Sequence, residues 1–359
     1  MNLASIQIID KIIPIPGADK IELAQVLGWQ AVVEKNKYKE GEKIIYIQLD
    51  TLLPYHPDYA FLERSSPFKC YGVEYGIDIK EGVKYTRLKT AKFLGNISQG
   101  LIMPLATYNL DINIETDADV SEIVGVVKYS KPIHVSMCGS AKGSFPSFIT
   151  KTDEERIQNI KNVLPMFNGK EVYETLKVDG TSATYYYLVD KDEFGICSRN
   201  MQMLEDGGSI YALIAERYQI KDRLIAYCKT LNKSIAIQGE IAGQGIQGNK
   251  LKIEGQKLFL FTAQEIIGGT HSKYLSAKSL STICELLSIR SVPFLQRYIF
   301  DSSKNTLENY LKEATQLEYN GVNCCEGKVI RVIEEDAHGA PPRGLSRWSF
   351  KVINNEYKD

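Results

Sequence analysis

Lys177 is the residue of this sequence best placed to act as a nucleophile. It opens the motif Lys177-Val178-Asp179-Gly180, which follows the strand-like stretch Val172–Leu176. A lysine amine attacks only after it has lost its proton, and its ordinary pKa is about 10.4. It therefore needs desolvation or a nearby cation, and a Mg²⁺ ion held by carboxylates would supply one. Taken alone the motif is weak, because a chain of this length contains it by chance about one time in ten.

Five later segments carry side chains suited to phosphate or metal chemistry where strands are predicted. In chain order they are Phe194–Asn200 with Arg199, Ile235–Glu240 with Glu240, Lys257–Phe261 with Phe261, Glu326–Ile330 with Glu326, and Trp348–Lys351 with Lys351. Each has a plainer interpretation, since surface charges and core phenylalanines are common in any protein. The ordered set, together with Lys177, is what predicts a site.

The first part of the chain predicts a small β-structure. Short β-branched segments at 3–15, 24–33, 43–49, 84–88 and 100–103 are separated by turn-forming residues. Strands at this spacing favour a small barrel, with an OB-fold among the candidates. Periodicity alone leaves a small sandwich open.

The second part predicts a mixture of strands and helices. Residues 126–150 are punctuated by Gly, Pro and Ser and predict a linker. Thr152-Asp153-Glu154-Glu155 then has the pattern of a capping box that begins a helix, and further helices are predicted at 209–218 and 277–287. The sequence predicts an α+β fold with an OB-fold domain over 1–125, a linker over 126–150, and an α+β domain built on antiparallel sheets over 151–359.

Composition excludes several classes of protein. No apolar stretch reaches the roughly 20 residues of a membrane helix, and the N-terminus lacks the pattern of a signal peptide, so we expect a cytoplasmic protein without membrane segments. Seven scattered cysteines without a CxxC pair predict reduced thiols and no zinc site. The net charge is −1, with an acidic excess in the first 130 residues. Contacts with a phosphate backbone must then come from local patches, more in the second part.

In this order the segments resemble the motifs of the covalent nucleotidyltransferase superfamily of polynucleotide ligases and RNA capping enzymes. The resemblance extends to the RNA ligase branch with an OB domain in front. Gly239–Lys250 resembles the long third motif of that branch and Ser349–Asn354 resembles its fifth motif. Phe145–Phe148 and Thr152–Arg156, ahead of the lysine motif, also resemble it. Together the blocks cover nearly the whole chain, which makes 151–359 an expected nucleotidyltransferase (adenylyltransferase) domain.

The resemblance implies a reaction and a metal. Lys177 would attack the α-phosphate of ATP, expel pyrophosphate and hold AMP as a phosphoramide. The AMP would pass to a 5′-phosphate, and a 3′-hydroxyl would then displace it. Asp179, Glu240 and Glu326 would hold Mg²⁺, or Mn²⁺ in its place, through the waters that Mg²⁺ tends to keep.

It also implies a set of ATP contacts: Thr175, Arg199, Glu240, Phe261 and Lys351. Arg199 would contact phosphates, Phe261 would stack on adenine, and Lys351 would neutralise charge on the α-phosphate. Two positions depart from the pattern. Leu176 replaces a glutamate that many relatives carry, which weakens the case for Thr175. Ile353 replaces a second lysine, so Lys351 would act alone or with Lys328.

The chain ends eight residues after Lys351, which leaves no room for the C-terminal OB domain usual in DNA ligases and capping enzymes. We therefore expect an ATP-dependent RNA ligase, acting in RNA repair on 3′-hydroxyl and 5′-phosphate RNA ends, with a nicked duplex as one form of substrate. Nothing in the sequence calls for an obligate protein partner. The alternatives are a DNA ligase or a GTP-dependent RNA capping guanylyltransferase that uses the same lysine, or a non-catalytic OB-containing RNA-binding protein.

Overall fold

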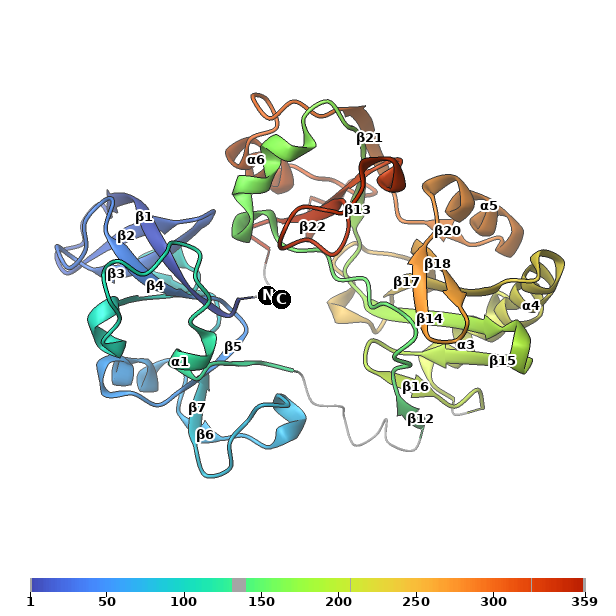
Figure 1. Cartoon of the computed structure of the whole chain (residues 1–359), viewed down its shortest axis with the longest axis horizontal. Helices are drawn as coiled ribbons and strands as arrows, with labels where there is room; N and C mark the ends of the chain where they lie inside the picture. Colours follow the sequence, from blue (N-terminus) through green and yellow to red (C-terminus); the bar gives the residue numbers. More distant parts are fainter. Residues whose placement is uncertain (1, 131–139, 207, 324, 358–359) are drawn as a thin grey trace. The chain divides into compact units, whose positions relative to one another are not determined.

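The computed structural model describes residues 2–130, 140–206, 208–323 and 325–357 (Figure 1). The chain divides into two compact units, residues 1–133 and 134–359. Near this division, β11 (Val127–Lys128) pairs with a strand of the first unit, and β12 (Ala141–Ser144) pairs with a strand of the second. Residues 131–139 of the predicted linker lie outside the described residues, and the boundaries 1–125, 126–150 and 151–359 stay a prediction.

The first unit is built from antiparallel strands that form an OB-like half-barrel. Its five-stranded sheet has the order β10-β4-β1-β2-β3, and a four-stranded sheet has the order β11-β5-β7-β6. The predicted β-structure is confirmed. The bounds are β1 Ala4–Pro14, β2 Ile21–Val26, β3 Trp29–Glu34, β4 Lys43–Ile47, β5 Thr51–Pro54, β6 Lys69–Cys70, β7 Lys84–Arg87 and β10 Leu101–Pro104, with β8 Ala91–Phe93 and β9 Asn96–Ser98 as a separate hairpin.

One predicted strand of this unit is in fact a hairpin. The sequence predicts a single segment over 24–33, but β2 and β3 pair antiparallel around a tight turn. Leu27 adopts a left-handed conformation there, with φ of 56°. A β-branched pattern without a strong turn dipeptide hides such a reversal, because tight hairpin turns are most visible in sequence when Gly or Asn provides the positive φ.

The second unit contains two sheets, which confirms the predicted α+β fold (Figure 1). The larger has the order β12-β16-β15-β14-β17-β18-β19, with β20 beside β18 in the one parallel pairing among the described strands. The smaller has the order β21-β13-β22-β23. The bounds are β13 Glu171–Lys177, β14 Thr181–Leu188, β15 Glu193–Cys197, β16 Met201–Met203, β17 Ser234–Gly243, β18 Gln256–Ile267, β19 His271–Tyr274, β20 Arg290–Ser291, β21 Phe294–Ile299, β22 Gly327–Val332 and β23 Ser349–Ile353.

Helices cover these sheets with their apolar faces. Side chains of α3 (Ile210–Arg217), α4 (Ile220–Leu231) and α5 (Ala277–Leu287) share one core with β14, β15, β17 and β18. Those of α6 (Leu307–Thr315) share a second core with β13, β22 and β23. The predicted helices at 209–218 and 277–287 are confirmed as α3 and α5, each begun by a serine that accepts a hydrogen bond from a backbone N–H of the first turn. None of the helices in the described ranges combines the length and apolar composition needed to cross a lipid bilayer.

The prediction of a helix after the capping-box sequence is wrong. Residues 152–155 have no regular secondary structure, and two 3₁₀ helices follow them, Ile157–Asn159 and Lys161–Phe167, the second containing Pro165. No side chain caps either of them. The carboxylates of Asp153 and Glu154 instead accept hydrogen bonds from basic side chains distant in sequence.

Candidate active site

Three neighbouring strands of the smaller sheet place the predicted residues on one face. Thr175 on β13 lies opposite Val329 on β22, which in turn lies opposite Lys351 on β23. Because side chains alternate between the two faces of a strand, Lys177 projects to the same side as Thr175. All four line a cavity of about 270 Å³. That volume is close to the lower end of small-molecule sites, about 300–1,000 Å³.

The other wall of the cavity comes from the larger sheet. Glu240 lies on β17, Phe261 on β18, and Arg199 in the turn after β15. The pairing of β17 with β18 shifts register beside Gly239, so Phe261 is the extra residue of a β-bulge. Bulges are frequent next to active sites because they re-aim a side chain, and this one turns Phe261 toward the cavity.

Gly180 explains why a glycine ends the lysine motif. A Cβ atom at this position would lie 2.3 Å from the backbone oxygen of Ile241 on β17. The two backbones can approach this closely only without a side chain. The glycine thus lets the turn after Lys177 lie against the strand that carries Glu240.

Lys177 is held among carboxylates. Its Nζ atom donates a hydrogen bond to Oε2 of Glu326 over 2.5 Å. Burial lowers the pKa of Lys177, but Glu326, Glu240 and Asp179 outweigh it and raise the pKa above its ordinary value. In this arrangement the amine is a cation, and it becomes a nucleophile only if other positive charge takes over the carboxylates.

The neighbouring carboxylates also affect the pKa of Glu240. Burial, followed by the charges of Glu326 and Asp179, raises its pKa to about 8, although Lys177 and Arg199 act in the opposite direction. A group of carboxylates that cannot all ionise comfortably is a suitable environment for a divalent cation. Across the described ranges, however, no three His, Cys, Asp or Glu side chains converge closely enough to ligate a metal directly.

Asp153 links the two cations that face the carboxylate group. It accepts hydrogen bonds from Lys351 Nζ at 3.1 Å and from Arg199 Nη2 at 2.9 Å. Burial is the main cause that lowers the pKa of Lys351, helped by the charges of Lys177 and Arg156 and opposed by Asp153. The cavity thus has an acidic end around Lys177 and a basic end around Lys351, the polarity that a phosphate chain with a bound metal requires.

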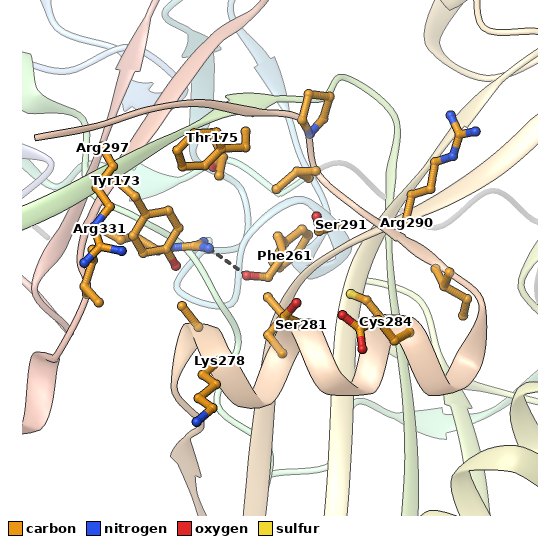
Figure 2. A pocket seen from close by; sticks show the side chains of 18 of the residues that line it. Tyr173, Thr175, Phe261, Lys278, Ser281, Cys284, Arg290, Ser291, Arg297 and Arg331 are labelled. Atoms are coloured by element: carbon orange, nitrogen blue, oxygen red, sulfur yellow. Dashed lines mark hydrogen bonds between the residues drawn. The ribbon is translucent and has the colours of Figure 1, made fainter.

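A buried ion pair that the sequence did not predict, Glu154 with Arg331, also lines this cavity. Arg331 on β22 donates two hydrogen bonds to Glu154, and its Nη1 donates to the backbone oxygen of Phe261 at 2.6 Å. Figure 2 shows the contact with Phe261 at a neighbouring cavity of about 820 Å³. The signal in the sequence was an arginine inside the apolar strand Val329–Val332, where an unpaired charge would be costly.

Seven of the eight predicted site residues therefore line one cavity: Thr175, Lys177, Arg199, Glu240, Phe261, Glu326 and Lys351. Asp179 does not line it, although its charge acts on Lys177 and Glu240. The sequence left open that Lys328 helps Lys351, and the structure does not place Lys328 in this cavity. Lys328 is 1% exposed and donates to Glu174 at 2.8 Å and to Glu313 at 2.6 Å, away from the cavity.

Comparison with known proteins shows the family to which this chain belongs. A family model described as RNA ligase matches residues 170–353, and one described as an OB-fold domain matches residues 3–105. The chain belongs to the RNA ligase family. The RNA ligase match spans the strands from β13 to β23, so every predicted site residue falls within it.

Solved structures of an RNA ligase from Naegleria gruberi resemble this RNA ligase over nearly its whole length. The structure with PPi is 31% identical, covers 99% of this chain and 97% of its own, and has a TM-score of 0.78. The structure of a lysine-to-alanine variant with ATP and Mn is 30% identical, covers 98% of this chain and 97% of its own, and has a TM-score of 0.79. A variant of a glutamate to alanine, also with ATP and Mn, is 30% identical, with coverage of 99% and 98% and the same TM-score. A search of curated proteins found no match.

Proposed function

We propose that this RNA ligase uses ATP and a divalent metal to seal a 3′-hydroxyl RNA end to a 5′-phosphate end through AMP bound covalently to Lys177. The observation that carries the proposal is the position of the Lys177 amine, enclosed by Glu326 and Glu240 and faced by Arg199 and Lys351 across one cavity. The Naegleria enzyme has been solved with ATP, AMP, PPi and Mn, which supports ATP and a divalent metal as its ligands.

The carboxylates set the charge state of the nucleophile. Asp179, Glu240 and Glu326 together keep the Lys177 amine protonated in the absence of other cations. A bound Mg²⁺, or Mn²⁺ in its place, would supply positive charge that offsets these carboxylates. Lys177 would then no longer have to balance them, so its amine could release its proton to solvent and attack the α-phosphate. The phosphorus–nitrogen bond forms as the bond to pyrophosphate breaks.

The rest of the cavity orients the nucleotide. Phe261 offers an aromatic face for adenine, and Thr175 lines the same cavity from β13 of the smaller sheet. Arg199 and Lys351 hold phosphate oxygens, and Lys351 lies on the same sheet face as Lys177, where it can balance charge that develops on the α-phosphate. This division of roles accounts for both the aromatic and the basic side chains of the site.

Labelling and sealing assays test the proposal. Incubation with α-labelled ATP and Mg²⁺ should label the protein on a denaturing gel, whereas α-labelled GTP should not. A nick with RNA on its 3′-hydroxyl side should then be sealed much faster than the same nick made entirely of DNA. A label from GTP alone, or equal sealing of the two nicks, would contradict the proposal.

A further inference from the structure

The segment Asn354–Tyr357, just after β23, contacts all three chain segments that carry the site carboxylates. Asn354 is buried, and its backbone N–H donates to the backbone carbonyl oxygen of Glu326 at 2.9 Å. Its side-chain amide donates to the oxygen of Cys325 at 3.3 Å. This asparagine therefore fastens the backbone at the point where Glu326 projects toward Lys177.

Tyr357, three residues later, reaches a second carboxylate. The backbone N–H of Tyr357 donates to the oxygen of Asn354 at 3.0 Å, which closes a tight turn. From this turn the Tyr357 hydroxyl donates a hydrogen bond to Oδ2 of Asp179. This hydrogen bond engages one of the two carboxylate oxygens of Asp179, whose charge acts on both Lys177 and Glu240.

The third contact comes from the loop after β17, the strand of Glu240. Lys250, at the end of the Gly239–Lys250 stretch, places its Nζ atom 3.9 Å from the centre of the Tyr357 ring. A cation over an aromatic face is attracted by about 0.5–2 kcal/mol, depending on its exposure to water. Tyr357 therefore contacts the loop after β17 through its ring and the turn that carries Asp179 through its hydroxyl.

We infer that Tyr357 is a positioning residue that fixes the orientation of the Asp179 carboxylate for the divalent metal, with Lys250 holding its ring in place. This inference rests on the proposed function, because it assumes that Asp179 faces a metal. An aspartate at the end of a turn can rotate freely about its side-chain bonds, and the phenol removes that freedom by engaging one oxygen only. A charge-assisted hydrogen bond of this kind is stronger than one between neutral groups.

Metal binding without turnover tests the inference. Tyr357→Phe removes only the hydroxyl, and Tyr227→Phe on α4 removes one far from the cavity. Both are made in a Lys177→Met background, which cannot form the covalent product. Binding of Mn²⁺ in the presence of ATP is followed by the loss of the free Mn²⁺ signal in electron paramagnetic resonance. Mutation of a residue that hydrogen-bonds to a metal ligand typically weakens metal binding about 10- to 100-fold. We therefore expect Tyr357→Phe to raise the Mn²⁺ dissociation constant about 10-fold. Tyr227→Phe should leave it unchanged.

The same exchange in the active enzyme gives a second readout. Tyr357→Phe should raise the Mg²⁺ concentration at half-maximal adenylylation by a similar factor, with the rate at saturating Mg²⁺ within about twofold. Unchanged Mn²⁺ affinity in Tyr357→Phe would overturn the inference. Tighter binding would overturn it too, because the phenol would then be competing with the metal. If Tyr357→Phe fails to fold, Lys250→Met replaces it and should shift the affinity in the same direction. A wild-type enzyme that takes no label from ATP at saturating Mg²⁺ would instead contradict the proposed function.

Discussion

The amine of Lys177 lies 2.5 Å from the carboxylate of Glu326, although the two residues are 149 positions apart in the chain. The pairing of β13 with β22 brings them together, since Lys177 is paired with Gly327 in the register of these strands. Glu326 is therefore both the counter-ion of the nucleophile and a member of the acidic group that suits a metal. The charge of Glu326 favours the protonated form of Lys177 until another cation neutralises that charge.

Glu326→Gln should separate these two roles. The exchange removes a charge that raises the pKa of Lys177, so the amine should lose its proton more easily. It also removes a contact of the proposed metal, and we expect that loss to dominate, with adenylylation about 10- to 100-fold slower at saturating ATP. Single-turnover labelling measures the rate. Glu318→Gln, an exposed glutamate shortly before it in the chain, is the matched control. A faster rate in Glu326→Gln would mean that the glutamate only restrains the lysine.

Phe261→Ala should weaken ATP binding. Stacking of a base on an aromatic side chain is worth roughly 1–3 kcal/mol by alanine substitution, so the KM for ATP should rise about 5- to 150-fold. Phe261→Tyr keeps the aromatic face and should stay close to wild type. The exposed Phe61 of the first unit serves as the control for loss of a phenylalanine. An unchanged KM in Phe261→Ala would place the adenine elsewhere.

Asp153→Asn should tighten the binding of pyrophosphate. The carboxylate holds both Arg199 and Lys351, the cations that we assign to phosphate oxygens. A partly exposed ion pair is worth roughly 0.2–1 kcal/mol, so its loss should lower the dissociation constant of pyrophosphate by up to about 5-fold. Calorimetric titration gives this constant, with Asp222→Asn on α4 for comparison. Weaker binding in Asp153→Asn would show instead that Asp153 is needed to place the two cations.

Glu154→Gln should destabilise the protein at neutral pH and much less in acid. Burial tends to raise the pKa of Glu154, but Arg331 and Arg347 outweigh it and hold the pKa below its ordinary value. A carboxyl with a lowered pKa in the folded state stabilises the fold above its unfolded pKa, and this contribution disappears as the pH falls through the folded pKa.

The size of this effect follows from the burial of the pair. Removing one partner of a buried ion pair costs about 3–5 kcal/mol, so Glu154→Gln should lower the free energy of unfolding by that order at pH 7. The difference from wild type should shrink below about pH 4. Urea unfolding across this range measures it. Glu171→Gln, which breaks the solvent-exposed pair with Arg297, should cost far less stability than Glu154→Gln at any pH. A difference for Glu154→Gln that is constant with pH would rule out the ion pair as its cause.

Much of the fold follows from local patterns in the sequence. Helices α3 and α5 have an apolar face and a serine at the start, and both signals act over a few residues. The β-branched segments of the first unit became strands for the same reason. The reversal at Leu27 did not follow, because its left-handed backbone is imposed by the pairing of β2 with β3 rather than by the residue type.

The prediction of the site depended on the order of segments along the chain rather than on local patterns. The order of the motif segments predicted Lys177, Glu240, Glu326 and Lys351 together, although no single one would have sufficed. The capping-box pattern misled because Asp153 and Glu154 suit a helix start and an ion pair equally well. Long-range pairing decides between the two, because Arg331 lies 177 residues after Glu154 and Lys351 lies 198 residues after Asp153. The bulge that re-aims Phe261 is likewise a property of the register between two strands.

Locating the AMP on the protein tests whether Lys177 is the nucleophile. The protein is incubated with ATP and Mg²⁺, digested, and its peptides are mapped by mass spectrometry, beside the variants Lys177→Met and Lys257→Met. We expect AMP in acid-labile linkage on the peptide that contains Lys177, its retention in Lys257→Met and its complete loss in Lys177→Met. AMP on any other residue, or its persistence in Lys177→Met, would show that Lys177 is not the nucleophile.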